Sequence, residues 1–265
     1  MSFNLNKDYY KAKMIGKNIS FQRILLIKND GHWSWKGVLH EFITSSHPVQ
    51  GELLEGVINE HNLVAGFRSS DPDKWRKDIT ILHAALKKEP NNTRYVFYLA
   101  QTYAASGQLE QALEQYERRI SMEEENKTCP EEFFWSLYSI GCLQSDLKRP
   151  HQVVIDSFLK AFFFDKTRAE PLYRLAIQFQ IMESYILGYV VLQWALKLPF
   201  PEKAPRIQHS VYDYLMSLKL AELSLKIGKQ EEGTSLYQAL LHHPKVPLES
   251  KKNIESILKH LVNKP

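Results

Sequence analysis

The longest regular pattern in the chain is helical and runs from about residue 70 to residue 262. Apolar residues recur there at intervals of three and four, as on the buried face of an amphipathic helix. Ser69 to Pro72 predicts a helix start, with a serine or aspartate cap and a proline in the first turn. Pro90 ends this first helix, further helices are expected around residues 95–105 and 112–120, and residues 248–262 predict a terminal helix.

A repeat unit is visible within this pattern. Small, apolar and aromatic residues hold the spacing of the 34-residue tetratricopeptide unit, and these are Leu99, Ala100, Tyr103, Gly107, Ala112 and Tyr116. The pattern recurs over Leu175–Ala195 and Leu220–Leu240. Small residues allow two antiparallel helices to approach closely, and aromatic residues fill the space between neighbouring hairpins. The sequence therefore predicts a mainly α-helical fold, a solenoid of tetratricopeptide-like hairpins over residues 70–265.

Residues 1–69 have a different pattern, with short apolar runs separated by turn residues. Phe21–Ile27 and Gly37–Ile43 are predicted strands, and Asn29–Gly31 is a turn suited to joining them as a hairpin. Val57–Phe67, bounded by glycines, is a third predicted strand. Because three strands need another surface to pack on, we expect a small β-rich segment beside the helices, with a domain boundary between residues 69 and 70.

Composition narrows the class of protein. Of the 265 residues 44% are hydrophobic, which is enough for a core. The 34 basic and 30 acidic residues give a net charge of +4 without a long block of one sign, so no nucleic-acid partner is expected. Cys129 and Cys142 lack the spacing of a metal module, which favours a reducing, cytoplasmic setting. No apolar stretch has the length of a membrane span or the form of a secretion signal.

Several strings resemble a known family. The run from Trp35 to Glu41 (WKGVLHE), the segment Phe67–Trp75 (FRSSDPDKW) and the string Arg168–Tyr173 (RAEPLY) are similar to the C-terminal half of family 2 glycosyltransferases with a tetratricopeptide tail. The resemblance spans nearly the whole chain. It implies that residues 1–69 are the end of a GT-A catalytic domain. The nucleotide-sugar half of that domain, which carries the family's DxD motif, is not in this sequence.

The resemblance also implies roles for two neighbouring residues. His40 matches the family's late histidine, which is expected to face a divalent metal, and Glu41 would orient or charge-balance the catalytic site. A metal neutralises the charge that develops on a leaving diphosphate, so Mn²⁺ or Mg²⁺ with a nucleotide sugar is expected only if a separate catalytic half completes the site. Asp71-Pro72-Asp73 has the form of a DxD, but it opens a helix and is read as a cap.

Four residues are candidates for binding a partner: Arg94, Tyr98, Arg168 and Arg174. The arginines either line a concave groove for an acidic peptide or a carbohydrate phosphate, or they pair with the many glutamates. Tyr98 belongs to an aromatic set that is read either as a ligand-binding wall or as packing between hairpins, of which packing is favoured.

Three hypotheses for the function stay open. The chain is part of a split glycosyltransferase, inactive alone, whose separately made catalytic half docks on residues 20–66 and whose acceptor is a protein, peptide or glycan. Alternatively it is a non-enzymatic tetratricopeptide scaffold for a protein or peptide. The third hypothesis is a divergent enzyme with a metal held by His40, Glu41 and Glu60. Unpaired strands and a solenoid surface also favour a homodimer.

Overall fold

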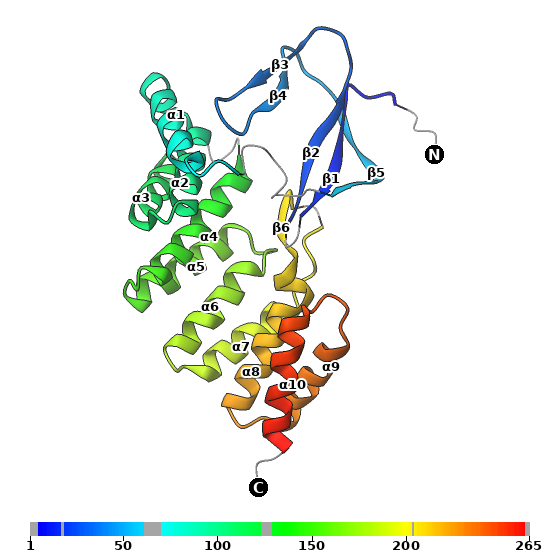
Figure 1. Ribbon diagram of the computed structural model, residues 1–265, viewed down its shortest axis with the longest axis vertical. Helices are drawn as coiled ribbons and strands as arrows, with labels where there is room; N and C mark the ends of the chain where they lie inside the picture. The colour runs from blue at the N-terminus through cyan, green and yellow to red at the C-terminus, as the bar shows by residue number, and fades with distance from the viewer. Residues whose placement is uncertain (1–4, 17–18, 61–69, 123–128, 203, 263–265) are drawn as a thin grey trace. The chain divides into compact units, whose positions relative to one another are not determined.

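The computed structural model describes residues 5–16, 19–60, 70–122, 129–202 and 204–262. These residues form a mainly helical chain with a small sheet near its N-terminus (Figure 1), which confirms the predicted fold class. The chain divides into two compact units. Unit 1 comprises residues 1–136 and 204–207, and unit 2 comprises residues 137–203 and 208–265. The domain boundary predicted between residues 69 and 70 adjoins residues 61–69, which lie outside the described ranges, and it stays a prediction.

Unit 1 contains a four-stranded sheet in the order β5-β1-β2-β6. Its strands are β1 (Tyr9–Ile15), β2 (Ile19–Ile27), β5 (Gly51–Glu60) and β6 (Arg206–Gln208), of which β6 has its first two residues in unit 1. β1 is antiparallel to β2 and parallel to β5. Tyr10, Ala12 and Met14 alternate along β1 and are buried, as in a strand with one covered face. β1 is absent from the predicted strands, although this alternation is visible in the sequence.

A second sheet in unit 1 is the hairpin of β3 (Trp33–Lys36) and β4 (Phe42–Ser45). The strand predicted over Gly37–Ile43 is wrong for most of its length, because residues 37–41 form the loop of this hairpin. The backbone gives the reason. Gly37 has φ 103° and His40 has φ 53°, and a strand admits neither value.

Two other strand predictions also need correction. The turn at Asn29–Gly31 does not join two paired strands, because β2 pairs with β1 and β3 pairs with β4. Of the third predicted strand, residues 57–60 lie in β5, which begins earlier than predicted, at Gly51. Residues 61–67 of that prediction lie outside the described residues.

The helices of unit 1 lie where the apolar pattern predicts them. They are α1 (Lys74–Lys88), α2 (Thr93–Ala105) and α3 (Leu109–Ser121), and α4 (Pro130–Asp146) begins in unit 1 and continues into unit 2. Leu82, Val96 and Leu99 are buried in the core between α1 and α2. Asn92 caps α2, where its Oδ1 accepts a hydrogen bond from the backbone N–H of Tyr95 at 3.1 Å.

The Asp71-Pro72-Asp73 segment serves the start of α1. The Asp71 carboxylate accepts hydrogen bonds from the backbone N–H of Asp73 at 2.9 Å and from Lys77 Nζ at 2.7 Å. The bond from Lys77, followed by the one from the Asp73 backbone, holds the pKa of Asp71 below its ordinary value. This arrangement matches the interpretation of the segment as a helix start. The Asp71 carboxylate is bonded to groups at the start of α1.

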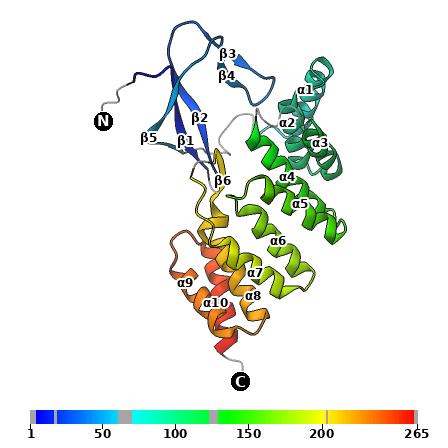
Figure 2. The same cartoon turned by 180° about the vertical axis from the view of Figure 1, so that it is seen from behind.

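Unit 2 consists of successive helical hairpins (Figures 1 and 2). Its helices after α4 are α5 (His151–Phe164), α6 (Glu170–Ile181), α7 (Tyr185–Ala195), α8 (Met216–Lys226), α9 (Gln230–His242) and α10 (Leu248–Val262), with a π-helical turn at Val211–Leu215 before α8. The terminal helix has the bounds that the sequence predicts. Nowhere in the described ranges is a helix both long enough and apolar enough to span a membrane.

Two glycines show why the repeat needs small residues. A Cβ atom at Gly188 of α7 would lie 3.0 Å from the carbonyl oxygen of Ala176 on α6, and one at Gly233 of α9 would lie 3.0 Å from that of Ala221 on α8. A side chain at either place would push two helix backbones apart. The close approach predicted from the repeat is therefore confirmed at two hairpins of unit 2.

Candidate functional site

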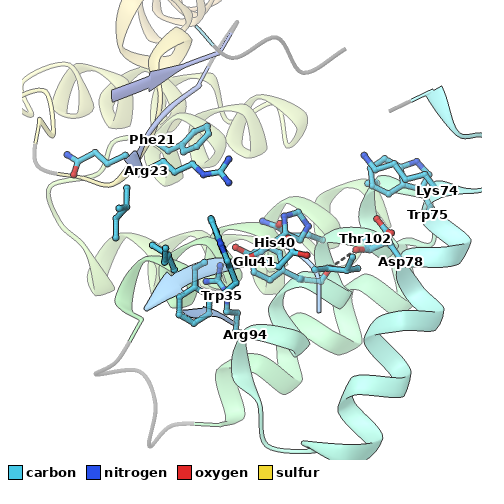
Figure 3. A pocket seen from close by; sticks show the side chains of 18 of the residues that line it. Phe21, Arg23, Trp35, His40, Glu41, Lys74, Trp75, Asp78, Arg94 and Thr102 are labelled. Atoms are coloured by element: carbon cyan, nitrogen blue, oxygen red, sulfur yellow. Dashed lines mark hydrogen bonds between the residues drawn. The ribbon is translucent and has the colours of Figure 1, made fainter. Parts of the chain in front are cut away.

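A pocket of about 810 Å³ lies within unit 1. It is lined by the β3–β4 hairpin and its loop, by β2, and by α1 and α2. Figure 3 shows His40 and Glu41 of the hairpin loop between Phe21 and Arg23 of β2 and the α1 side chains. Its size falls in the range that accommodates a small ligand or a few residues of a peptide.

Helix spacing positions the wall that α2 contributes. Arg94, Tyr98, Gln101, Thr102 and Ala105 all line the pocket, and their intervals of three and four place them on one face of the helix. The opposite face carries Val96, Leu99 and Ala100, which are fully buried. The repeat pattern that builds the core therefore also fixes which α2 residues face the pocket.

Arg94 joins the hairpin loop to the helices. Its guanidinium donates to Glu132 Oε1 at 2.6 Å and to the carbonyl oxygen of His40 at 3.0 Å. The guanidinium carbon also lies 4.7 Å from the ring centroids of Phe42 and of Tyr98, within the range of cation–π attraction. Arg94 thus connects the hairpin loop to α2 and α4 through both of its terminal nitrogens.

His40 lies flat against α2. Its ring stacks on Tyr98 with centroids 4.1 Å apart and an angle of 8° between the planes. The preceding residue, Leu39, is buried in the core of α1 and α2. His40 and Glu41 are both exposed at the pocket. The loop that the resemblance singles out is therefore anchored at Leu39 and at the His40 carbonyl, and it presents two polar side chains.

Burial raises the pKa of two groups beside Arg94, Glu132 and Tyr98. Desolvation raises the pKa of Glu132, and the attraction of Arg94 offsets this only in part. Desolvation likewise raises the pKa of Tyr98, so this phenol stays neutral across the physiological range.

The described residues do not by themselves form a metal site. Within the described ranges, no three His, Cys, Asp or Glu side chains gather closely enough to hold an ion. His40 and Glu41 are neighbours, and Glu60 does not line the pocket, so a divalent metal would need further ligands from outside these residues. The metal role of His40 and the catalytic role of Glu41 stay predictions that rest on the resemblance.

Aromatic and basic side chains gather around the pocket. Trp35 is 62% exposed, Phe42 41% and Trp75 38%, and Lys74 Nζ lies 4.3 Å from the centroid of the Trp75 ring. Lys11 and Arg23 also line the pocket. Trp35 and Trp75 stand in the strings that carry the family resemblance, but no partner role was predicted for them, because their exposure cannot be read from the sequence.

Two predicted partner-binding arginines lie elsewhere, in unit 2. Arg168 is fully buried and donates to the two carboxylate oxygens of Glu170 at 3.1 and 2.8 Å, and Glu170 also accepts from the Tyr212 hydroxyl. The expected place of Arg168 in a ligand groove therefore needs correction. Its guanidinium is buried and paired with Glu170, as the alternative of pairing with a glutamate predicts. Arg174 is half-buried and donates to the Tyr138 hydroxyl at 3.2 Å.

Comparison with known proteins finds similar folds among solved structures, but it finds no match by sequence. No protein-family model matches the chain, and no curated protein matches it either. Among solved structures, one of the protein MamA is similar with a TM-score of 0.51 and 14% identity, over 72% of this chain and 97% of that one. MamA from Desulfovibrio magneticus, residue 41 to its end, has a TM-score of 0.50 and 12% identity over 72% and 89%.

A tetratricopeptide repeat protein from Parabacteroides merdae is similar to the same degree, with a TM-score of 0.51 and 18% identity over 63% of this chain and 59% of that one. The helices form a tetratricopeptide-type fold. At these identities the likeness concerns the fold alone, and the glycosyltransferase part of the resemblance gains no support from it.

Proposed function

We propose that this protein is a non-enzymatic tetratricopeptide scaffold that binds an extended acidic segment of a partner protein in the pocket of unit 1. One observation carries the proposal. Three exposed aromatic side chains, Trp35, Phe42 and Trp75, line a pocket that also has basic residues in its wall. Exposed aromatic residues that gather in one place are typical of protein-binding surfaces.

The charges at the pocket favour an acidic segment. Lys11, Arg23 and Lys74 line it, whereas its acidic residues are Glu41, which is exposed, and Asp78, which is only 4% exposed. Arg94 is already engaged by Glu132 and His40. The remaining basic groups attract carboxylates, and the tryptophans supply apolar contact area, so the preferred segment combines aspartate or glutamate with apolar side chains.

Selection from a displayed library of random 12-residue peptides tests this proposal. We expect the recovered peptides to be enriched in acidic and apolar residues and to bind with micromolar affinity. Lys74→Glu and Trp35→Ala should each weaken binding about tenfold. Lys87→Glu, on the same helix but outside the pocket lining, and Trp194→Ala in unit 2 are the matched controls and should leave affinity unchanged. Recovered peptides without acidic enrichment, or unchanged binding in both pocket variants, would refute the proposal.

A second candidate keeps the glycosyltransferase resemblance, in which a separately made catalytic half docks on the strands of unit 1. Its structural support is the exposure of apolar side chains on β2 and β5: Leu25, Leu26 and Ile27 on β2, and Leu53 and Ile58 on β5. Such a surface is a ready interface for another chain. In this reading His40 and Glu41 contribute to a metal and nucleotide-sugar site that the other half completes.

Calorimetry separates the two candidates. A titration of the purified chain with UDP-glucose and Mn²⁺ should give no heat if the chain is a scaffold. Heat at micromolar concentration that disappears with His40→Ala would replace the scaffold proposal with the split enzyme. Phe163→Ala, an exposed aromatic change in unit 2, is the control that should not affect such heat.

A further inference from the structure

Helix α7 in unit 2 has an unusual outer face. None of its residues from Tyr185 to Ala195 is charged. Its inner face is buried through Gly188, Leu192 and Ala195, as the repeat requires. Its outer face exposes large apolar side chains, of which Ile186 is 66%, Leu187 52%, Val190 54% and Trp194 49% exposed. An amphipathic surface helix normally carries charged residues there.

The corresponding face of α9, the second helix of the next hairpin, is ordinary. Its exposed positions include Gln230, Glu231, Ser235 and Gln238. Both helices occupy the same place in the repeat, so the fold itself does not require apolar residues on the outside of α7. An apolar outer face on one helix of a repeat indicates an interface.

The apolar surface extends from α7 onto the end of α5. The Trp194 ring contacts Phe162 edge-on, with centroids 5.0 Å apart, and Phe162 lies beside Phe163 at 5.8 Å. Phe163 is 63% exposed and Phe164 40%. Apolar contacts therefore run from Trp194 through the buried Phe162 to the exposed Phe163 at the end of α5.

The charges that flank this face are arranged symmetrically. Glu183 precedes α7 and Lys197 follows it, both exposed, and each lies seven residues from Val190. Glu183 lies in the turn that leads into α7, and Lys197 lies in the turn that follows it, so an acidic side chain flanks one end of the helix and a basic side chain flanks the other. Two such helices that cross antiparallel at Val190 would bring Glu183 of each copy near Lys197 of the other.

We propose that α7 pairs with α7 of a second copy of this chain, antiparallel, around a two-fold axis near Val190. The interface is isologous, so one face must be complementary to itself. An uncharged centre satisfies this condition because it brings no like charges together. The acidic start and basic end satisfy it because antiparallel pairing matches opposite charges. This inference is independent of the peptide pocket, which lies in unit 1.

The expected affinity is moderate. A standard stable interface buries about 800 Å² of each partner, and the outer face of one helix with two phenylalanines is smaller than that. We therefore expect a dimer that dissociates at concentrations of about 10–100 µM, so that monomer and dimer are both observable.

Sedimentation velocity of the full chain between about 1 and 200 µM tests the pairing. Val190→Asp puts two carboxylates at the axis and should raise the dissociation constant at least tenfold. Val153→Asp is the control, since Val153 is also exposed on unit 2 (41%) but lies at the opposite end of α5 from Phe163. Circular dichroism verifies that both variants keep their helix content. A wild-type chain that stays monomeric throughout, or a dimer unaffected by Val190→Asp, overturns the proposal.

Exchange of the charges at Glu183 and Lys197 tests whether the partner is a second copy of this chain and whether the two helices pair antiparallel. Glu183→Lys and Lys197→Glu should each weaken the dimer several-fold, because like charges then face each other. The double variant should restore the wild-type dissociation constant. Glu183 has φ 56°, and lysine tolerates this backbone about as well as glutamate, so the exchange adds no new strain. If the double variant remains as weak as the single ones, the two-fold pairing at Val190 is refuted.

Discussion

The α8–α9 hairpin of unit 2 and the β3–β4 hairpin of unit 1 are held in place in opposite ways. In the first, Gly233 lets two backbones meet, and the contact is made by the repeat itself. In the second, a loop with left-handed backbone at His40 is held by side chains, because Leu39 is buried against α1 and α2 and Arg94 donates to the His40 carbonyl. A packed helical hairpin therefore depends on the absence of a side chain at one position, whereas the pocket wall depends on side chains that reach it from other elements.

The largest expected effect tests the packed hairpin. Gly233→Val places a branched side chain against Leu225 and the Ala221 carbonyl, and we expect the free energy of unfolding of unit 2 to fall by about 3 kcal/mol. Ser235→Val, at an exposed position on the same helix, is the control and should change it by less than about 0.5 kcal/mol. Urea denaturation measures both. Equal effects would show that the close approach is not needed.

The next effect tests the pocket wall. Arg94→Gln leaves the Glu132 carboxylate without its ion-pair partner and releases the His40 carbonyl, so we expect a loss of about 2 kcal/mol in stability. Hydrogen exchange should accelerate most at residues 37–43. Arg118→Gln, which removes one bond to the Pro90 carbonyl at the surface, serves as the comparison. Unchanged exchange in the hairpin loop would refute the role assigned to Arg94.

A smaller effect separates binding from stability in the same region. Trp35 is mostly exposed, so Trp35→Ala should change the free energy of unfolding by less than about 0.5 kcal/mol while it weakens the selected acidic peptides about tenfold. Thermal unfolding and fluorescence anisotropy measure the two quantities. A large loss of stability would mean that Trp35 is part of the packing and not of the binding surface.

The smallest effect concerns pH. Burial raises the folded-state pKa of Glu132 above the ordinary glutamate value of about 4.3. The folded chain then binds this proton more tightly than the unfolded chain does. As the pH falls from neutral, the wild type should gain stability relative to Glu132→Gln, and below about pH 4.3 the gain is complete. Urea denaturation of both chains at pH 4–7.5 measures the difference. A trend in the opposite direction would mean that the ion pair with Arg94 dominates.

The helices were predictable because their determinants are local. Tyr95, Leu99 and Ala100 point to one buried face through spacing alone, and α10 has the bounds that its apolar pattern gives. The strands were harder, because two of their determinants are not local or not visible in the sequence. The sequence gives no sign that His40 adopts a positive φ, and β1 pairs in parallel with β5, from which it is separated in the sequence by β2, β3 and β4.

The residues of the candidate site likewise differ in whether the sequence alone could identify them. The resemblance drew attention to His40 and Glu41, and the charge and aromatic patterns to Arg94 and Tyr98, and the structure brings these four together at one pocket. Arg168 shows the opposite outcome, because burial beside Glu170 depends on tertiary packing that its sequence neighbours do not specify. The exposure of Trp35 and Trp75 is likewise a property of the folded surface.

The position of β6 constrains the order in which the protein is completed during synthesis. This strand adds to the sheet of unit 1 beside β2, and Ile207 within it is buried, yet it follows α7 in the chain. At roughly 5–20 residues per second, translation of residues 137–203 takes on the order of 10 s. During that time β2 has an open edge on the nascent chain. The sheet of unit 1 can therefore be completed only after α1 to α7 have been synthesised.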